Sequence, residues 1–164
     1  ACRQNGAVGQ SADEQQRQVL LDSVHMQREA LKEAFQAQEG LEEAAEDFSD
    51  IAERFADHFP QDSLSPVLLF EAADVAGGAG EPGLSIKLWG RVQRYYPEFE
   101  KAPDALFMQA FVFETMIGDK HNARRYYQQF LKRFPEHQLS EAAVLALKTL
   151  EKSPEELIRE FEKK

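Results

Sequence analysis

Apolar residues recur every three or four positions along most of the chain, which is the spacing that lines one face of an α-helix. In the stretch from 102 to 117, the recurring positions include Leu106, Ala110 and Phe113. A second apolar set follows between residues 120 and 134. Gly118 lies between the two sets and suits a left-handed helix exit, and Pro135 ends the second helix. We therefore predict a helix-turn-helix unit over residues 102–135.

The same pattern occurs once more, 37 or 38 residues earlier. In the first helix the offset is 37: Pro66, Leu69, Phe70 and Ala73 correspond, in this order, to Pro103, Leu106, Phe107 and Ala110. From the turn onward the offset is 38: Gly80, Trp89 and Pro97 correspond to Gly118, Tyr127 and Pro135. The later copy therefore contains one extra residue between Ala110 and Gly118. Pro60, Pro97 and Pro135 each follow an aromatic residue, so a half-copy ends at Pro60 as well.

These patterns predict one helical domain over residues 12–164. We expect a disordered tether at 1–11, because this segment is polar and contains glycine. The expected elements are a capping helix at 12–38, a half repeat at 42–60, repeats at 65–97 and 102–135, and closing helices at 139–150 and 154–163. The capping helix would bury Leu20, Val24, Leu31 and Phe35. The glycine-rich residues 77–83 would form a flexible turn.

A period of this length, with small residues where helices meet and proline at the exit, resembles the tetratricopeptide repeat (TPR). In that pattern Ala73 and Ala110 fall on the small residue of the first helix, and Trp89 and Tyr127 on the aromatic of the second. Ser85 replaces the usual alanine, which is a departure. The resemblance implies an all-α fold, an α-α superhelix (TPR-like solenoid) with N-terminal and C-terminal capping helices. The repeats look most like those of bacterial envelope lipoproteins of the β-barrel assembly and Tol-Pal coordinator type.

The resemblance also implies a groove lined by the first helix of each repeat. By that analogy, the candidate groove residues are Val67, Phe70, Asp74, Asp104, Phe107, Phe111, Glu114 and Thr115. Phenylalanines beside carboxylates would hold an apolar peptide with basic flanks. The alternative is that the long N-terminal helix covers these rings and makes them part of the core. The sequence alone leaves both interpretations open.

Cys2 is the only cysteine, which excludes an internal disulfide and a cysteine-based zinc site. A cysteine followed by a flexible polar segment resembles the processed end of a bacterial lipoprotein, so we expect lipidation at Cys2. The alternative is an unmodified thiol in a polar tail. A membrane contact would then depend on this lipid, because no run of about 18 apolar residues is present.

The charge distribution and the polar residues argue against several other functions. The net charge of the chain is −10, and the negative charge is concentrated in residues 1–82, whose own net charge is −12. This half of the chain would repel the phosphates of a nucleic acid, so a nucleic-acid partner is disfavoured. The carboxylates between 42 and 53 fit a solvated helix face better than a calcium loop. The four histidines form no metal-binding pair, and no serine lies in a hydrolase motif. We therefore expect no catalytic residues, no metal and no cofactor.

The sequence thus predicts a non-enzymatic scaffold for protein-protein interaction, with a protein or peptide partner. The expected location is the bacterial cell envelope, on the periplasm-facing side of the outer membrane through the lipid on Cys2. The alternative location is the cytoplasm, as a soluble protein. The alternative function is a structural or oligomerising helical domain without a peptide-binding groove, whose partner is a second copy of the chain.

Overall fold

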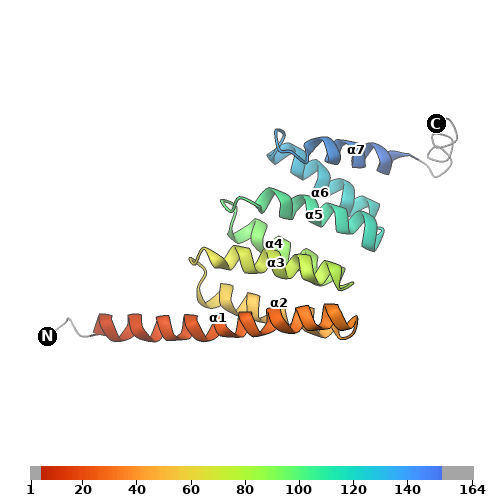
Figure 1. Ribbon diagram of the computed structural model, residues 1–164. Helices are drawn as coiled ribbons and strands as arrows, with labels where there is room; N and C mark the ends of the chain where they lie inside the picture. The colour runs from red at the N-terminus through yellow and green to blue at the C-terminus, as the bar shows by residue number, and fades with distance from the viewer. Residues whose placement is uncertain (1–4, 153–164) are drawn as a thin grey trace. The chain divides into compact units, whose positions relative to one another are not determined.

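The computed structural model describes residues 5–152, and the side chains of residues 12–152 (Figure 1). These residues form helices and turns, with no strand among them. The helices are α1 (Asn5–Ala37), α2 (Leu41–His58), α3 (Leu64–Gly78), α4 (Pro82–Tyr95), α5 (Ala102–Val112), the π-helical turn η1 (Phe113–Ile117), α6 (Lys120–Arg133) and α7 (Ser140–Glu151). The all-α class is confirmed. The closing helix expected at 154–163 lies outside the described residues, as does Cys2.

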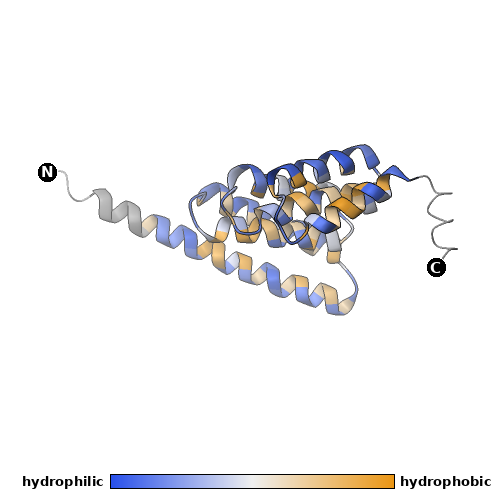
Figure 2. Ribbon diagram, turned by 90° about the horizontal axis from the view of Figure 1, so that it is seen from above, coloured by the Kyte–Doolittle hydropathy of each residue, from blue (hydrophilic) through white to orange (hydrophobic). Residues whose placement is uncertain are grey.

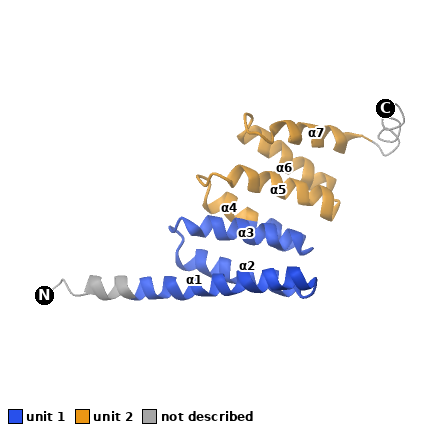
Figure 3. Cartoon of the chain, in the orientation of Figure 1, with its two compact units in different colours: residues 1–88 blue, residues 89–164 orange. Residues whose placement is uncertain are grey.

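The chain divides into two compact units, residues 1–88 and residues 89–164, and the division falls within α4 (Figure 3). In unit 1, α2 packs against both α1 and α3. In unit 2, α6 packs against α5, η1 and α7. Each unit therefore contains a middle helix with a neighbour on either side.

Helix α1 begins earlier than we predicted. Residues 5–11, for which we expected a disordered tether, form its first turns. Once a helix is nucleated, each added residue gains a backbone hydrogen bond at little further cost, and no proline interrupts this segment. With 33 residues against 18 in α2, α1 is about 50 Å long and α2 about 27 Å, at 1.5 Å per residue. Helix α1 therefore extends past α2 (Figure 1).

The turn between α3 and α4 is shorter than the flexible segment that we predicted over 77–83. Helix α3 continues through Gly78, and Pro82 already opens α4, as suits a residue without an N–H. Only Ala79, Gly80 and Glu81 connect the two helices. Gly80 has a φ of 88°, a left-handed conformation that favours glycine. One residue with this conformation is enough to reverse the chain.

The extra residue expected between Ala110 and Gly118 coincides with the π-helical turn Phe113–Ile117. A π-helical turn contains one more residue than an α-helical turn, so it absorbs an insertion without rotating the rest of the helix. Gly118 then ends the helix with a φ of 76°, which confirms the predicted left-handed exit. The change of repeat offset from 37 to 38 thus has a direct structural counterpart.

Two connections between helices use the same hydroxyl contact. Residues 59–65 and 134–140 share the pattern Phe-Pro-x-x-x-Leu-Ser. The Ser65 hydroxyl donates to the Phe59 carbonyl at 2.6 Å, and the Ser140 hydroxyl donates to the Phe134 carbonyl at 2.8 Å. Each serine therefore ties the start of a first helix to the carboxyl end of the preceding helix, which satisfies a carbonyl that the helix leaves unpaired.

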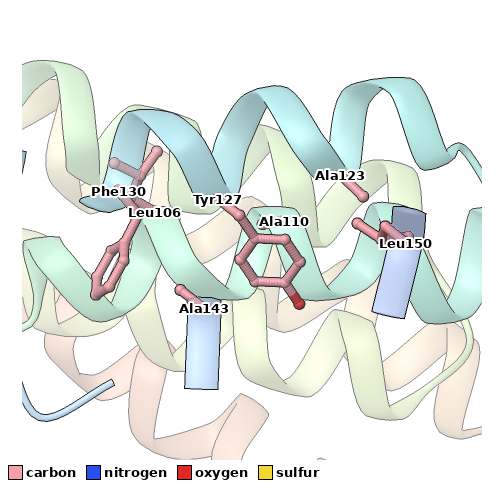
Figure 4. Close-up of a cluster of buried hydrophobic side chains, with 7 residues drawn as sticks. All are labelled: Leu106, Ala110, Ala123, Tyr127, Phe130, Ala143 and Leu150. Atoms are coloured by element: carbon pink, nitrogen blue, oxygen red, sulfur yellow. The ribbon is translucent and has the colours of Figure 1, made fainter. Parts of the chain in front are cut away.

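Each unit has its own apolar core. In unit 1, Leu20 and Val24 of α1 lie against a middle helix that buries Phe48 and Phe55. Hydrophilic and hydrophobic residues alternate along α1, as expected for a helix with one apolar stripe (Figure 2). The core of unit 2 consists of Leu106, Ala110, Ala123, Tyr127, Phe130, Ala143 and Leu150 (Figure 4). The small residues let the helix backbones approach closely, and the rings fill the remaining space.

Candidate functional site

Two arginines of α1 position this helix within unit 1. The Arg17 guanidinium donates to the Asp62 carboxylate at 2.6 Å, and the same carboxylate accepts from the Leu64 backbone N–H at 2.9 Å. Arg17 therefore holds the pKa of Asp62 below its ordinary value of 3.8, because its hydrogen bond favours the charged form. About three turns further along, Arg28 pairs with Glu71 of α3. Helix α1 is thus joined by charged groups to the α2–α3 connection and to the middle of α3.

Two adjacent cavities lie between α1, α2 and α3. The first has a volume of about 330 Å³ and is lined by Leu31, Lys32, Phe35, Leu41, Val75 and Gly78. The second, of about 300 Å³, is lined by Arg28, Leu31, Phe48, Glu71, Asp74 and Val75. Because both include Leu31 and Val75, we treat them as one site, the α1–α3 cleft. Its lining is apolar at one end and charged at the other, so it suits apolar side chains with polar flanks.

The predicted groove residues of unit 1 lie in different environments. Asp74 is exposed and lines the second cavity, and Val67 is half-buried. Phe70 is only 8% exposed, so of the two interpretations that the sequence left open its ring belongs to the core. Its place in the apolar stripe of α3 turns the ring into the core. Of the eight predicted residues, Asp74 is the one that the α1–α3 cleft contains.

The α1 residues of the cleft were missed by the sequence-based prediction. We expected Leu31 and Phe35 to be core, yet Phe35 is 72% exposed and both line the first cavity. The interpretation in which α1 covers the groove is therefore only partly right, since α1 packs on α2 and leaves a cleft toward α3. Leu31 and Phe35 continue the apolar stripe of α1 two and three turns beyond Val24, which was the available signal. Spacing alone, however, does not distinguish a residue of the core from a residue that lines a cleft.

In unit 2, two of the predicted groove residues support the hairpin. The Phe107 ring lies edge-on to Tyr127 and Phe130, with ring centres 5.4 and 5.6 Å away. The Glu114 carboxylate accepts a hydrogen bond from the Tyr127 hydroxyl at 2.8 Å. Burial, and then this contact with a carboxylate, raises the pKa of Tyr127. Phe107 and Glu114 thus pack the second helix against the first.

The other predicted residues of unit 2 are closer to the surface. Phe111 is 42% exposed, and its carbonyl accepts from the Thr115 hydroxyl at 2.8 Å. Asp104 lies 3.7 Å from the Nε2 atom of His137, at the turn before α7. The two phenylalanines of this set, Phe107 and Phe111, therefore do not form one accessible pair. Phe111 remains as an exposed aromatic on α5.

Between residues 5 and 152, no group of three or more His, Cys, Asp or Glu side chains is arranged to hold a metal ion. In the same part of the chain, no helix is long and apolar enough to cross a membrane.

Comparison with known families identifies one repeat directly. Residues 104–137 match the tetratricopeptide repeat family. The match covers α5, η1 and α6, and it coincides with the repeat that we predicted at 102–135. The TPR-like helical fold class is therefore confirmed, and the chain contains a tetratricopeptide repeat. No curated protein matches the chain.

Proposed function

We propose that this protein is a non-enzymatic module that binds a protein partner through the α1–α3 cleft. The observation that carries the proposal is the open cleft itself, where the apolar side chains of Leu31 and Val75 line both cavities. A tetratricopeptide repeat in the same chain supports a protein as the partner, because such repeats typically present helix faces for binding.

The cleft favours an extended or helical segment that carries apolar side chains. Leu31, Phe35 and Leu41 provide one apolar wall, and Val75 provides the other. Lys32 lines the first cavity and Asp74 lines the second. The cleft therefore presents one positive and one negative side chain to charged residues of the partner. Burying a single leucine-sized side chain contributes roughly 1.5–3 kcal/mol, which is enough to anchor a peptide when two are buried.

Peptide-library panning on the purified full chain would test this function. Selected peptides should lose affinity for the Val75→Glu variant, because a carboxylate on the cleft floor opposes apolar side chains. The matched control is Met26→Glu, which adds the same charge at an exposed position on α1 outside the cleft lining. Equal binding to both variants would show that the cleft is not the site. Circular dichroism of both variants would confirm that they are folded.

We also propose that the protein is held in a bacterial envelope by a lipid on Cys2. The lone cysteine in a small, polar segment ahead of the described side chains supports this idea. Expression of the natural gene in a bacterial host with labelled palmitate would test it. Incorporation of label that disappears in Cys2→Ser is the expected result. An unlabelled protein, or unchanged labelling in Cys2→Ser, would show that the lipid is not there.

A further inference from the structure

Helix α7 has an exposed apolar surface. Val144 is 40% exposed and Leu145 is 66% exposed. Together with Leu131 and Pro135 of the preceding helix and connection, they line a cavity of about 610 Å³. A helix face that is covered by water is normally polar, so this valine–leucine pair is a candidate contact surface.

The repeat shows which kind of element this surface can receive. Val144 lies 37 residues after Phe107, so the two residues occupy the same position of a first helix. The Phe107 ring contacts Tyr127 and Phe130 of α6, which runs antiparallel to α5 in the same hairpin. The corresponding side of α7 is therefore suited to an antiparallel helix.

Two residues of opposite charge flank the apolar pair symmetrically. Glu141, Val144, Leu145 and Lys148 lie on one side of α7, and all four line the cavity. Glu141 precedes the midpoint between Val144 and Leu145 by as many residues as Lys148 follows it, which is about 5 Å along the axis at 1.5 Å per residue. When this face is turned end over end, each charge lies level with the opposite charge, so the pattern is complementary to itself.

We propose that α7 pairs antiparallel with α7 of a second copy of the chain, about a two-fold axis that passes between Val144 and Leu145. A self-complementary face is what a symmetric dimer requires, because both copies contribute the same surface. The axis places the apolar pairs of the two copies together. It also places Glu141 of each copy opposite Lys148 of the other, which gives two ion pairs per dimer. The proposal concerns unit 2 and does not depend on the α1–α3 cleft.

The size of the surface sets the expected affinity. Helix α7 has 12 residues and is about 18 Å long. Stable protein interfaces bury about 1,200 Å² or more in total, which one pair of short helices does not reach. We therefore expect a reversible dimer with a dissociation constant of about 10–100 μM. Sedimentation equilibrium of the full chain with Cys2→Ser, which prevents a disulfide between copies, measures this constant.

Reversal of single charges tests the register. Glu141→Lys and Lys148→Glu each place like charges opposite one another twice per dimer, so each should raise the dissociation constant at least about threefold. An equimolar mixture of these two variants should recover the wild-type value, because two lysines of one copy then face two glutamates of the other. The double variant, with both substitutions in one chain, should also dimerise like the wild type. Only pairing with a second copy in this register predicts both recoveries.

An apolar substitution tests the surface itself. Leu145→Glu should raise the dissociation constant at least about tenfold, because a carboxylate replaces an apolar contact in both copies. The matched control Met116→Glu adds the same charge at a 43% exposed residue of unit 2 outside α7, and it should leave the constant unchanged. Circular dichroism of each variant confirms that it is folded.

Three results would overturn the proposal. A wild-type chain that stays monomeric up to about 300 μM would show that another part of the chain or a different protein covers α7. A dimer that persists in Leu145→Glu would lie on another surface. Charge-reversal variants that do not recover on mixing would rule out the antiparallel register.

Discussion

The two units build helix hairpins from the same repeat positions, but they distribute large and small residues differently. Counting back by the repeat offsets, Ala52 of α2 corresponds to Tyr127 of α6, and Phe48 of α2 corresponds to Ala123. All four side chains are buried or nearly so. The large residue has therefore moved by one helical turn between the two middle helices.

This exchange accompanies a difference in what each unit does with its interior. In unit 2, Tyr127 and Phe130 join Phe107 and Phe134 in a continuous aromatic core. In unit 1, Phe48 lies instead at the floor of the α1–α3 cleft, beneath the Arg28 guanidinium, which is 6.0 Å from the ring centre. The rings of the α5–α6 hairpin fill its interior, whereas Phe48 of unit 1 lines a cleft that stays open.

The units also differ in the forces that join their helices. Helix α1 packs on α2 through the buried Leu20 and Val24, and it is further held by the ion pairs of Arg17 and Arg28, which weaken in salt. The contacts of α6 are mostly rings and alanines, which salt does not weaken. Unit 1 should therefore open more readily than unit 2. Four experiments test this contrast.

Phe130→Ala should have the largest effect. Removal of a fully buried ring from a filled core costs about 3–5 kcal/mol in the free energy of unfolding. Phe35→Ala, at an exposed ring of the cleft, should change it by no more than about 0.5 kcal/mol. Urea unfolding followed by circular dichroism measures both. Similar losses for the two variants would mean that the cleft is as tightly packed as the core.

Deletion of single residues should distinguish α3 from the π-helical turn. Deleting Asp74 rotates the rest of α3 by 100° and should cost about 1–3 kcal/mol, the usual range for a disruptive change. Deleting Thr115 removes the spare residue of the 113–117 turn, so the loss should be less than half as large. Urea unfolding again provides the comparison. If the Thr115 deletion lowers the free energy of unfolding more than the Asp74 deletion does, the π-helical turn does not absorb an inserted residue.

Tyr127→Phe should have a smaller effect, confined to unit 2. It removes the hydroxyl that donates to Glu114 while keeping the ring, and the net value of such a hydrogen bond is about 1 kcal/mol. Glu114→Gln is the matched control, because it keeps an acceptor for the hydroxyl. Thermal unfolding should rank the wild type first, Glu114→Gln second and Tyr127→Phe last. An unchanged Tyr127→Phe variant would contradict a role for this contact.

Acid should weaken the Arg17–Asp62 contact, with the smallest effect of the four. The pKa of Asp62 is lowered in the folded protein, so its contribution is complete above its ordinary value of 3.8. It is lost as the pH falls through the lower folded value, because the protonated carboxyl no longer pairs with Arg17. The difference in unfolding free energy between wild type and Asp62→Asn should therefore be constant from pH 7 to 5 and shrink below pH 4. A constant difference down to pH 2 would rule out this linkage.

Sequence reasoning was most successful for features that repeat along the chain. The hairpin at 102–135, its glycine exit at Gly118 and the extra residue before it all follow from local spacing, and the structure and the family match contain each of them. It was less successful for the site. Phe111 lies one helical turn beyond Phe107, the residue that matches Phe70 at the offset of 37, yet Phe70 is buried and Phe111 is exposed.

Helix periodicity, the 37-residue and 38-residue offsets and the proline exits were thus enough to determine an all-α, repeat-built protein, because each of these signals can be followed along the sequence without knowing which helices touch. Where the interior stays open depends on contacts between helices that are distant along the chain. Arg28 reaches Glu71 across 43 residues, and Leu31 and Phe35 face a cleft only because Val75 lies opposite them. Tertiary packing alone decided which apolar residues became core and which line the cleft, since the same side chain satisfies the same helical pattern in either place.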